Sequence, residues 1–100
     1  MTDAEFAQYL DAKFLELSPE LLVKAKGIFS TLLPMWRGSF WASYKKHGAQ
    51  WFMEDYGHLR LGMAIRNLLR ENGVMDTDVP DNNLDDYYIQ MLEYWMGVRK

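Results

Sequence analysis

The chain has 100 residues, about the length of one domain, and a formal net charge of -3. Hydrophobic residues make up 49% and charged residues 25% of the chain, a composition typical of globular proteins that excludes a disordered one. The acidic balance argues against nucleic acid as a partner, because binding to phosphates requires a basic surface. Cysteine is absent, which excludes disulfides, thiolate metal sites and a cysteine nucleophile.

The first predicted helix begins with a capping box. Thr2 and Glu5 stand three residues apart, so each side chain can accept a hydrogen bond from a free amide of the first turn. Apolar residues then recur every three or four positions, which predicts a helix over residues 3–17 with one face toward a core. These apolar residues are Phe6, Tyr9, Leu10, Phe14 and Leu17.

The second predicted helix is bounded by prolines. Ser18 is a typical N-cap residue, and Pro19 occupies the first helical position, where its missing amide hydrogen is not needed. The apolar spacing continues to about residue 33. Pro34 should end this helix or begin the next one, because proline disfavours helical geometry in the residue before it. The very short turn between the first two helices should form a sharp corner.

Aromatic residues are spread through the next segment, with glycines between them. We predict a helix over residues 35–47 that Gly48 closes as a C-cap. A further helix should begin at Trp51 or Tyr56 and run to residue 71, where Asn72-Gly73 forms a left-handed cap.

The last part of the chain combines an acidic segment with an apolar helix. Residues 74–83 contain turn formers and acids without periodic apolar residues, so we predict a loop. A final helix should begin after Asn82 or Asn83, with Asp85 and Asp86 in its first turn. Its apolar side would consist of Tyr88, Met91, Leu92 and Trp95. The sequence therefore predicts an all-α, compact bundle of about five helices in a single domain.

Residues 58–67, HLRLGMAIRN, resemble the H-x-x-x-G-M-x-I-R-N signature of a family of small uncharacterised bacterial proteins. In that family an Asp-Asp pair leads into a terminal helix rich in Leu and Trp, which looks like Asp85-Asp86 and the stretch from Leu92 here. The resemblance covers roughly residues 55–98 and implies a bacterial origin without an established activity. Tyr88 departs from the family, which has a small hydroxylated residue two places after the pair.

Three polar residues, His58, Arg66 and Asn67, lie in a predicted helix otherwise devoted to packing. His58 and Arg66 are separated by about 12 Å along a helix, so they can frame one surface but cannot act on one atom. We expect a structural role, in which Arg66 pairs with Asp85 or Asp86 while His58 and Asn67 hydrogen-bond to loop backbone.

The acidic loop does not fit a calcium-binding template. Pro80 occupies the third ligand position, Asp81 stands where glycine is needed, and Tyr87 replaces the bidentate glutamate. His47 and His58 are the sole histidines, too few for a transition-metal site without cysteine. Neither a nucleophile beside an oriented base nor a glycine-rich phosphate loop is recognisable. We therefore predict that the chain is not an enzyme and has no cofactor, no metal and no catalytic residues.

The aromatic segment 35–52 carries the strongest binding signal, because Trp, Tyr and Arg are enriched at interface hot spots. The candidate partner-binding residues are Trp36, Arg37, Trp41, Tyr44 and Lys45. Alternatively, these rings supply bulk to a small core.

We predict a non-catalytic protein-binding module, such as an inhibitor, immunity or adaptor protein of a bacterium or a mobile element. The alternative hypothesis is a homo-oligomeric structural protein, for example a homodimer, that buries its aromatic surface against its own copy. The acidic N-terminus lacks the features of a signal peptide, and no apolar run approaches the ~18 residues of a membrane span. A cytoplasmic protein without membrane contact is therefore expected.

Overall fold

The protein is built from helices and short turns, as a computed structural model that describes residues 2–54 and 61–99 shows. In chain order the elements are α1 (Asp3–Leu15), α2 (Pro19–Leu32), the 3₁₀ helix η1 (Pro34–Trp36), α3 (Arg37–Glu54), α4 (Met63–Glu71), the 3₁₀ helices η3 (Asp76–Asp78), η4 (Pro80–Asn82) and η5 (Leu84–Asp86), and α5 (Tyr88–Met96). The described residues contain no β-strand. The predicted all-α bundle of about five helices is confirmed.

Side-chain caps fix the beginnings of α1 and α2. The amide of Glu5 donates to Thr2 Oγ1 over 3.1 Å and the amide of Thr2 donates to Glu5 Oε1, as the capping box predicts. Ser18 Oγ accepts the amide of Leu21 over 3.1 Å. Ser18 has the extended backbone of an N-cap residue. Helix α1 ends before this turn, at Leu15 rather than at the predicted residue 17.

Helix α3 differs from its prediction at both ends. Residues 34–36 form η1, so the α-helix begins at Arg37 and not at residue 35. Gly48 breaks the helix where a stop was predicted, with a φ of 77° that favours glycine. Helical turns resume after this break and continue to Glu54, so Gly48 kinks the element and does not end it. The predicted start of the next helix at Tyr56 lies outside the described residues.

The chain beyond α4 is more ordered than the predicted loop. Gly73, with a φ of 93°, ends α4 as predicted, and the amide of Val74 returns to the carbonyl of Leu69 over 2.9 Å. Three 3₁₀ helices follow, and Val74, Val79 and Leu84, which precede or begin them, are buried, one apolar side chain every five residues. This spacing matches neither a helix nor a strand, which explains why the pattern predicted a loop.

The last helix begins later than predicted. Asp85 and Asp86 belong to η5, and α5 starts at Tyr88, so the two acids are not in its first turn. Asn83 caps η5 instead, because its side chain accepts the amide of Asp85. The helix ends at Gly97, whose φ is 84°.

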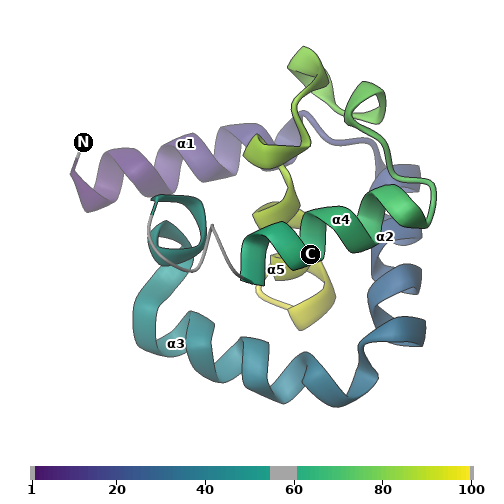
Figure 1. Ribbon diagram of the computed structural model, residues 1–100. Coiled ribbons are helices and arrows are strands. Elements are labelled where there is room, and N and C mark those ends of the chain that lie inside the picture. Colours follow the sequence, from purple (N-terminus) through teal and green to yellow (C-terminus); the bar gives the residue numbers. More distant parts are fainter. Residues whose placement is uncertain (1, 55–60, 100) are drawn as a thin grey trace.

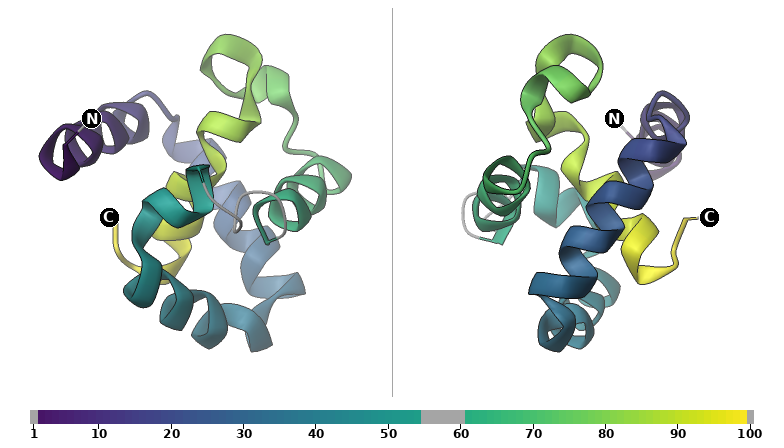
Figure 2. Two further views of the ribbon diagram at one scale, coloured as in Figure 1. Left: turned by 60° about the vertical axis from the view of Figure 1, so that its left-hand side comes forward. Right: turned by 90° about the vertical axis from the view of Figure 1, so that its right-hand side faces the viewer.

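Helix α5 lies in the middle of the molecule, with α1, α2 and α3 around it and α4 in front of it (Figure 1). The views in Figure 2 show the same central position. All of its residues except Tyr94 are buried, whereas the sequence predicted one buried side. Side chains on all sides of α5 are buried because several elements pack against this one helix. Gln90 and Glu93 are consequently buried in the core.

Gln90 provides a test of this buried position. Its side chain is fully buried, and neither amide atom hydrogen-bonds to the described residues. A buried polar group without a partner costs about 1–3 kcal/mol. We therefore expect Gln90→Met, which keeps the length of the side chain, to raise the free energy of unfolding in urea by about 1 kcal/mol. Gln8→Met, at an exposed position of α1, should change it by less than about 0.5 kcal/mol. A loss of stability in Gln90→Met alone would contradict this expectation.

Candidate partner-binding groove

An apolar groove of about 370 Å³ lies between α4 and the corner where α2 passes through η1 into α3. Its lining residues are all hydrophobic: Leu33, Trp36, Phe40, Leu61, Ala64, Ile65 and Leu68. We call these seven residues the apolar groove. Its volume is within the usual range for cavities that accept a ligand or an anchoring side chain.

Helical spacing places the lining residues on facing surfaces. Trp36 and Phe40 are four residues apart on one side of the groove. On the other side, Ala64 and Leu68 are also four apart along α4. Phe40 is buried against the ring of Trp95, with 6.3 Å between ring centroids, and so forms part of the floor. The groove is therefore supported from below by the core.

Large apolar side chains are exposed on the elements that form the groove. Met35 is 91% exposed and Trp36 57%, while Leu32 and Met63 are each 46% exposed. A small domain gains nothing for its own stability from apolar surface left in water, and such patches commonly mark interaction sites. Trp36 both lines the groove and stands out at its edge.

The predicted partner-binding residues fall into two groups. Trp36, Trp41 and Lys45 are exposed, and the ammonium of Lys45 lies 5.4 Å from the centre of the Trp41 ring. Arg37 and Tyr44 are instead engaged within the protein. The guanidinium of Arg37 donates to the carbonyls of the last turn of α5, over 3.4 Å to that of Trp95 and 2.9 Å to that of Met96.

Tyr44 belongs to a network around the buried carboxylate of Glu93. Its hydroxyl donates to Glu93 Oε2 over 2.5 Å, and Arg99 Nε lies 3.1 Å from Glu93 Oε1. Arg99 also pairs with Asp11 on α1 over 2.6 Å. A buried carboxylate requires such partners. Burial, followed by the bond to Glu93, raises the pKa of Tyr44 well above its ordinary value of 10.0, so the hydroxyl remains a donor.

Removing this hydroxyl should weaken the fold. Tyr44→Phe leaves the Glu93 carboxylate with one donor fewer, so we expect the free energy of unfolding to fall by about 1–3 kcal/mol. Tyr9→Phe is the matched control, because the half-buried hydroxyl of Tyr9 makes no hydrogen bond within the described residues. Urea denaturation of both variants checks the difference. Equal effects would mean that the bond to Glu93 contributes nothing.

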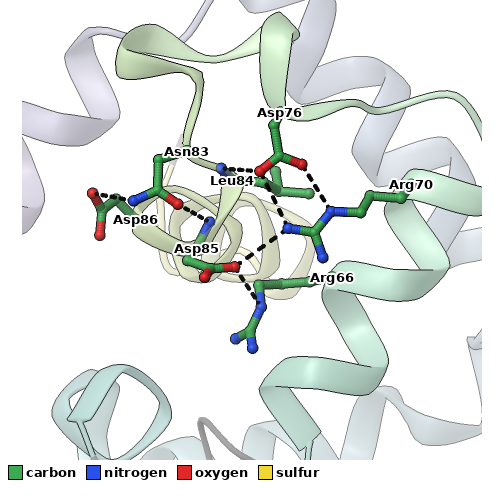
Figure 3. Close-up of polar contacts among 7 residues, drawn as sticks. All are labelled: Arg66, Arg70, Asp76, Asn83, Leu84, Asp85 and Asp86. Carbon is green, nitrogen blue, oxygen red and sulfur yellow. Dashed lines mark hydrogen bonds and ion pairs between the residues drawn. The ribbon is translucent and has the colours of Figure 1, made fainter.

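A second polar cluster joins α4 to the segment before α5 (Figure 3). Arg66 Nε lies 2.7 Å from Asp85 Oδ1, which is the pair that the sequence predicted. Arg70 lies one helical turn further on and contacts Asp76 with two nitrogens, over 2.8 and 3.2 Å, and Asp85 over 3.4 Å. Sequence reasoning missed Arg70 and Asp76, although the spacing of the two arginines already placed them on one face of α4.

The remaining predicted members of this cluster are placed differently. Asp86 does not join the arginines and accepts instead from the side chain of Asn83 over 3.1 Å. Asn67 is exposed on α4, and His58 lies outside the described residues. Asp76 also accepts the amide of Leu84 over 3.3 Å. The cluster therefore connects α4 to residues 76–86, which we call the 3₁₀ segment. Its charges cancel pairwise, which favours the structural role that we expected.

Gly62 allows α4 to approach the start of α5 closely. A Cβ atom at this position would overlap the hydroxyl oxygen of Tyr88 and would lie 3.1 Å from Arg66 Nη1. Arg66 lies over the Tyr88 ring, 5.0 Å from its centre. Burial raises the pKa of the Tyr88 hydroxyl to about 12, which keeps it neutral at physiological pH. Tyr88 of α5 thus packs closely against Gly62 and Arg66 at the start of α4.

The contribution of Asp76 should depend on pH. The Arg70 guanidinium holds the pKa of Asp76 below its ordinary value of 3.8, so its ionised form stabilises the folded state. This contribution is present above about pH 4 and is lost as the pH falls through the lowered pKa. We expect Asp76→Asn to reduce the free energy of unfolding by about 1–2 kcal/mol at pH 7 and by much less near pH 3.

Asp81→Asn is the control for this titration. Asp81 pairs with Lys13 at 3.8 Å with its side chain 72% exposed, and asparagine tolerates its positive φ. Its removal should change stability by less than about 1 kcal/mol at both pH values. A constant effect of Asp76→Asn between pH 7 and pH 3 would contradict the assigned ion pair.

Within residues 2–54 and 61–99, no group of three or more His, Asp or Glu side chains is placed to hold a metal ion. None of the described helices combines the length and the apolar character that crossing a bilayer requires.

Comparison of the chain with protein-family models, curated proteins and solved structures gives no match in any of the three. The resemblance of residues 58–67 to a bacterial family stays a prediction.

Proposed function

We propose that this chain is a small, non-catalytic protein-binding module that uses the apolar groove. The observation that carries the proposal is the position of Trp36, which lines the groove and is 57% exposed at its edge. Tryptophan is the residue type most enriched at interface hot spots. Burial of such surface stabilises a complex by about 25 cal/mol for each Å² of apolar area removed from water.

The groove also supports a non-catalytic role. None of its seven lining residues carries an acid, a base or a nucleophile. Arg66 and Tyr44, which follow the groove residues Ile65 and Phe40 by one and four positions, serve other contacts, since Arg66 pairs with Asp85 and Tyr44 with Glu93. An inhibitor, immunity or adaptor protein is the more specific form of this proposal, and it rests on the small size of the chain. The bacterial origin and cytoplasmic location stay expectations from the sequence.

Site-specific photocrosslinking in the producing cell tests the proposal. A benzophenone amino acid in place of Met35, which is 91% exposed beside the groove, should give a covalent adduct with a different protein. The same probe in place of Met75, which is 49% exposed just before η3, is the control and should give no such adduct. Figure 1 shows that the two regions lie at opposite ends of the molecule.

Each other result has a defined meaning. An adduct between two copies of this chain would favour the homo-oligomeric alternative, and light scattering of the purified protein would then give a dimer or larger species. Equal labelling from Met35 and Met75 would indicate random collisions and would refute the proposed site. The same refutation would follow if neither position gave an adduct.

A further inference from the structure

A second cavity, of about 380 Å³, lies where α2, the start of α3 and the end of α5 meet. It shares no lining residue with the apolar groove. Two of the side chains that line it are cations, two carry hydroxyl groups, and none of the lining residues described is an acid. The walls are formed by Lys26 and Ser30 on α2, Pro34 and Arg37 at the corner between α2 and α3, and Tyr94 and Trp95 on α5.

The guanidinium of Arg37 is held in one orientation by the end of α5. Its Nε and Nη2 donate to the carbonyls of Trp95 and Met96, over 3.4 and 2.9 Å, and these two donors form one edge of the group. A guanidinium has five N–H donors in a planar fork, so three remain. The end-on edge, formed by Nη1 and the second hydrogen of Nη2, makes no hydrogen bond within the described residues. That edge matches two oxygens of one phosphate or carboxylate group.

The other polar side chains of the cavity are also available to a ligand. The ammonium of Lys26 lies 5.5 Å from the centre of the Tyr94 ring, which places its charge beside the α5 wall. Neither Lys26 nor Arg37 forms an ion pair with an acid of residues 2–54 and 61–99, and the hydroxyls of Ser30 and Tyr94 make no hydrogen bond there. Glu93 precedes Tyr94 but is buried and engaged in the core. The cavity therefore offers two positive charges that no described carboxylate neutralises.

We infer that this cavity binds a phosphate monoester group. A phosphate monoester carries a charge of about -1.5 to -2 at pH 7 and has three strong acceptor oxygens. Its charge matches the two cations, and the free edge of Arg37 pairs with two of its oxygens while Lys26 and the hydroxyls of Ser30 and Tyr94 donate to the remaining acceptor sites. This inference goes beyond the proposed function, because the apolar groove takes no part in it.

Charge and geometry favour this ligand over two other anions. A carboxylate carries one negative charge and would leave one of the two cations without a partner. A nucleic-acid backbone requires contacts to several phosphates, whereas this cavity supplies two cations on a chain with a net charge of -3. Pro34 and the ring of Tyr94 add an apolar wall for the carbon part of an ester.

Titration of the whole ¹⁵N-labelled protein with phenyl phosphate at pH 7 and low salt tests the inference. Nuclear magnetic resonance should show saturable shifts of the amides of Ser30, Tyr94 and Gly97, which line the cavity. Benzoate keeps a ring and one negative charge, and should bind about fivefold more weakly or less tightly still. Phenol keeps the ring without the charge and should not shift these amides.

A matched pair of lysine substitutions locates the site. Lys26→Gln removes a cation of the cavity and should weaken binding of phenyl phosphate by about fivefold or more. Lys46→Gln removes an exposed cation of α3 that does not line the cavity, and should change binding by less than about twofold. Arg37→Lys keeps the charge but loses the fork, and should also weaken binding. Thermal unfolding checks that each variant is folded, and Lys26→Gln decides if Arg37→Lys is not.

A phosphoserine peptide distinguishes the two sources of such a group. Tighter binding of this peptide than of phenyl phosphate would assign the cavity to a phosphorylated protein, and the reverse order would assign it to a small phosphate ester. Either order supports a phosphate site.

Three results would overturn the inference. The first is the absence of shifts at Ser30, Tyr94 and Gly97 with phenyl phosphate at about 10 mM, a concentration that saturates even a weak site. The second is binding of benzoate or phenol as tight as that of phenyl phosphate, which would refute the assigned chemistry. The third is an equal effect of Lys26→Gln and Lys46→Gln, which would indicate general ionic attraction to the surface.

Discussion

The burial of α5 is the constraint on which the rest of this structure depends. A central helix that carries Glu93 and ends in free carbonyls can be buried only if other elements supply donors to it. Arg37 and Tyr44 from α3 supply three such donors, and Arg99 links the same carboxylate to α1 through Asp11. The polar requirements of α5 therefore hold α1, α3 and the C-terminal residues in place around it.

The apolar groove is a consequence of how α3 and α4 are held. Helix α3 is fixed by its contacts with α5, whereas α4 is fixed by Tyr88 and by the arginines that pair with Asp76 and Asp85. Among the described residues no side chain fills the space between the helices, and its lining is apolar because both helices turn hydrophobic residues toward it.

Acidic and basic residues are separated along the chain. Most of the aspartates lie in the 3₁₀ segment, where Asp76 and Asp85 neutralise arginines of α4. Between Glu20 and Glu54 the chain has no acid and five basic residues, although it is acidic as a whole. Net charge is for this reason a poor guide to the partner of such a protein, because recognition depends on the local surface.

The local structure could be read from the sequence to a large extent. Thr2 and Ser18 predict the starts of the first two helices, and Gly73 the end of α4, because capping depends on residues within one turn. The pairing of Arg66 with an aspartate of the last segment could also be anticipated, since a buried guanidinium requires an acid. The start of α5 was misplaced because Asp85 and Asp86 are equally suited to a 3₁₀ turn.

The candidate site depended on information that the sequence does not contain. Among the aromatic residues of η1 and α3, the sequence could not separate Trp36, which is exposed, from Tyr44, which is bound to Glu93, because helical spacing does not tell which neighbours surround a helix. The groove brings together residues from two separate parts of the chain, 33–40 and 61–68, so only the tertiary structure reveals it. By itself the sequence determined the helical class, the caps and the segregation of charge, all of which depend on near neighbours in the chain. The tertiary structure alone decided which helix is buried and where apolar surface remains open, because both depend on packing between distant segments.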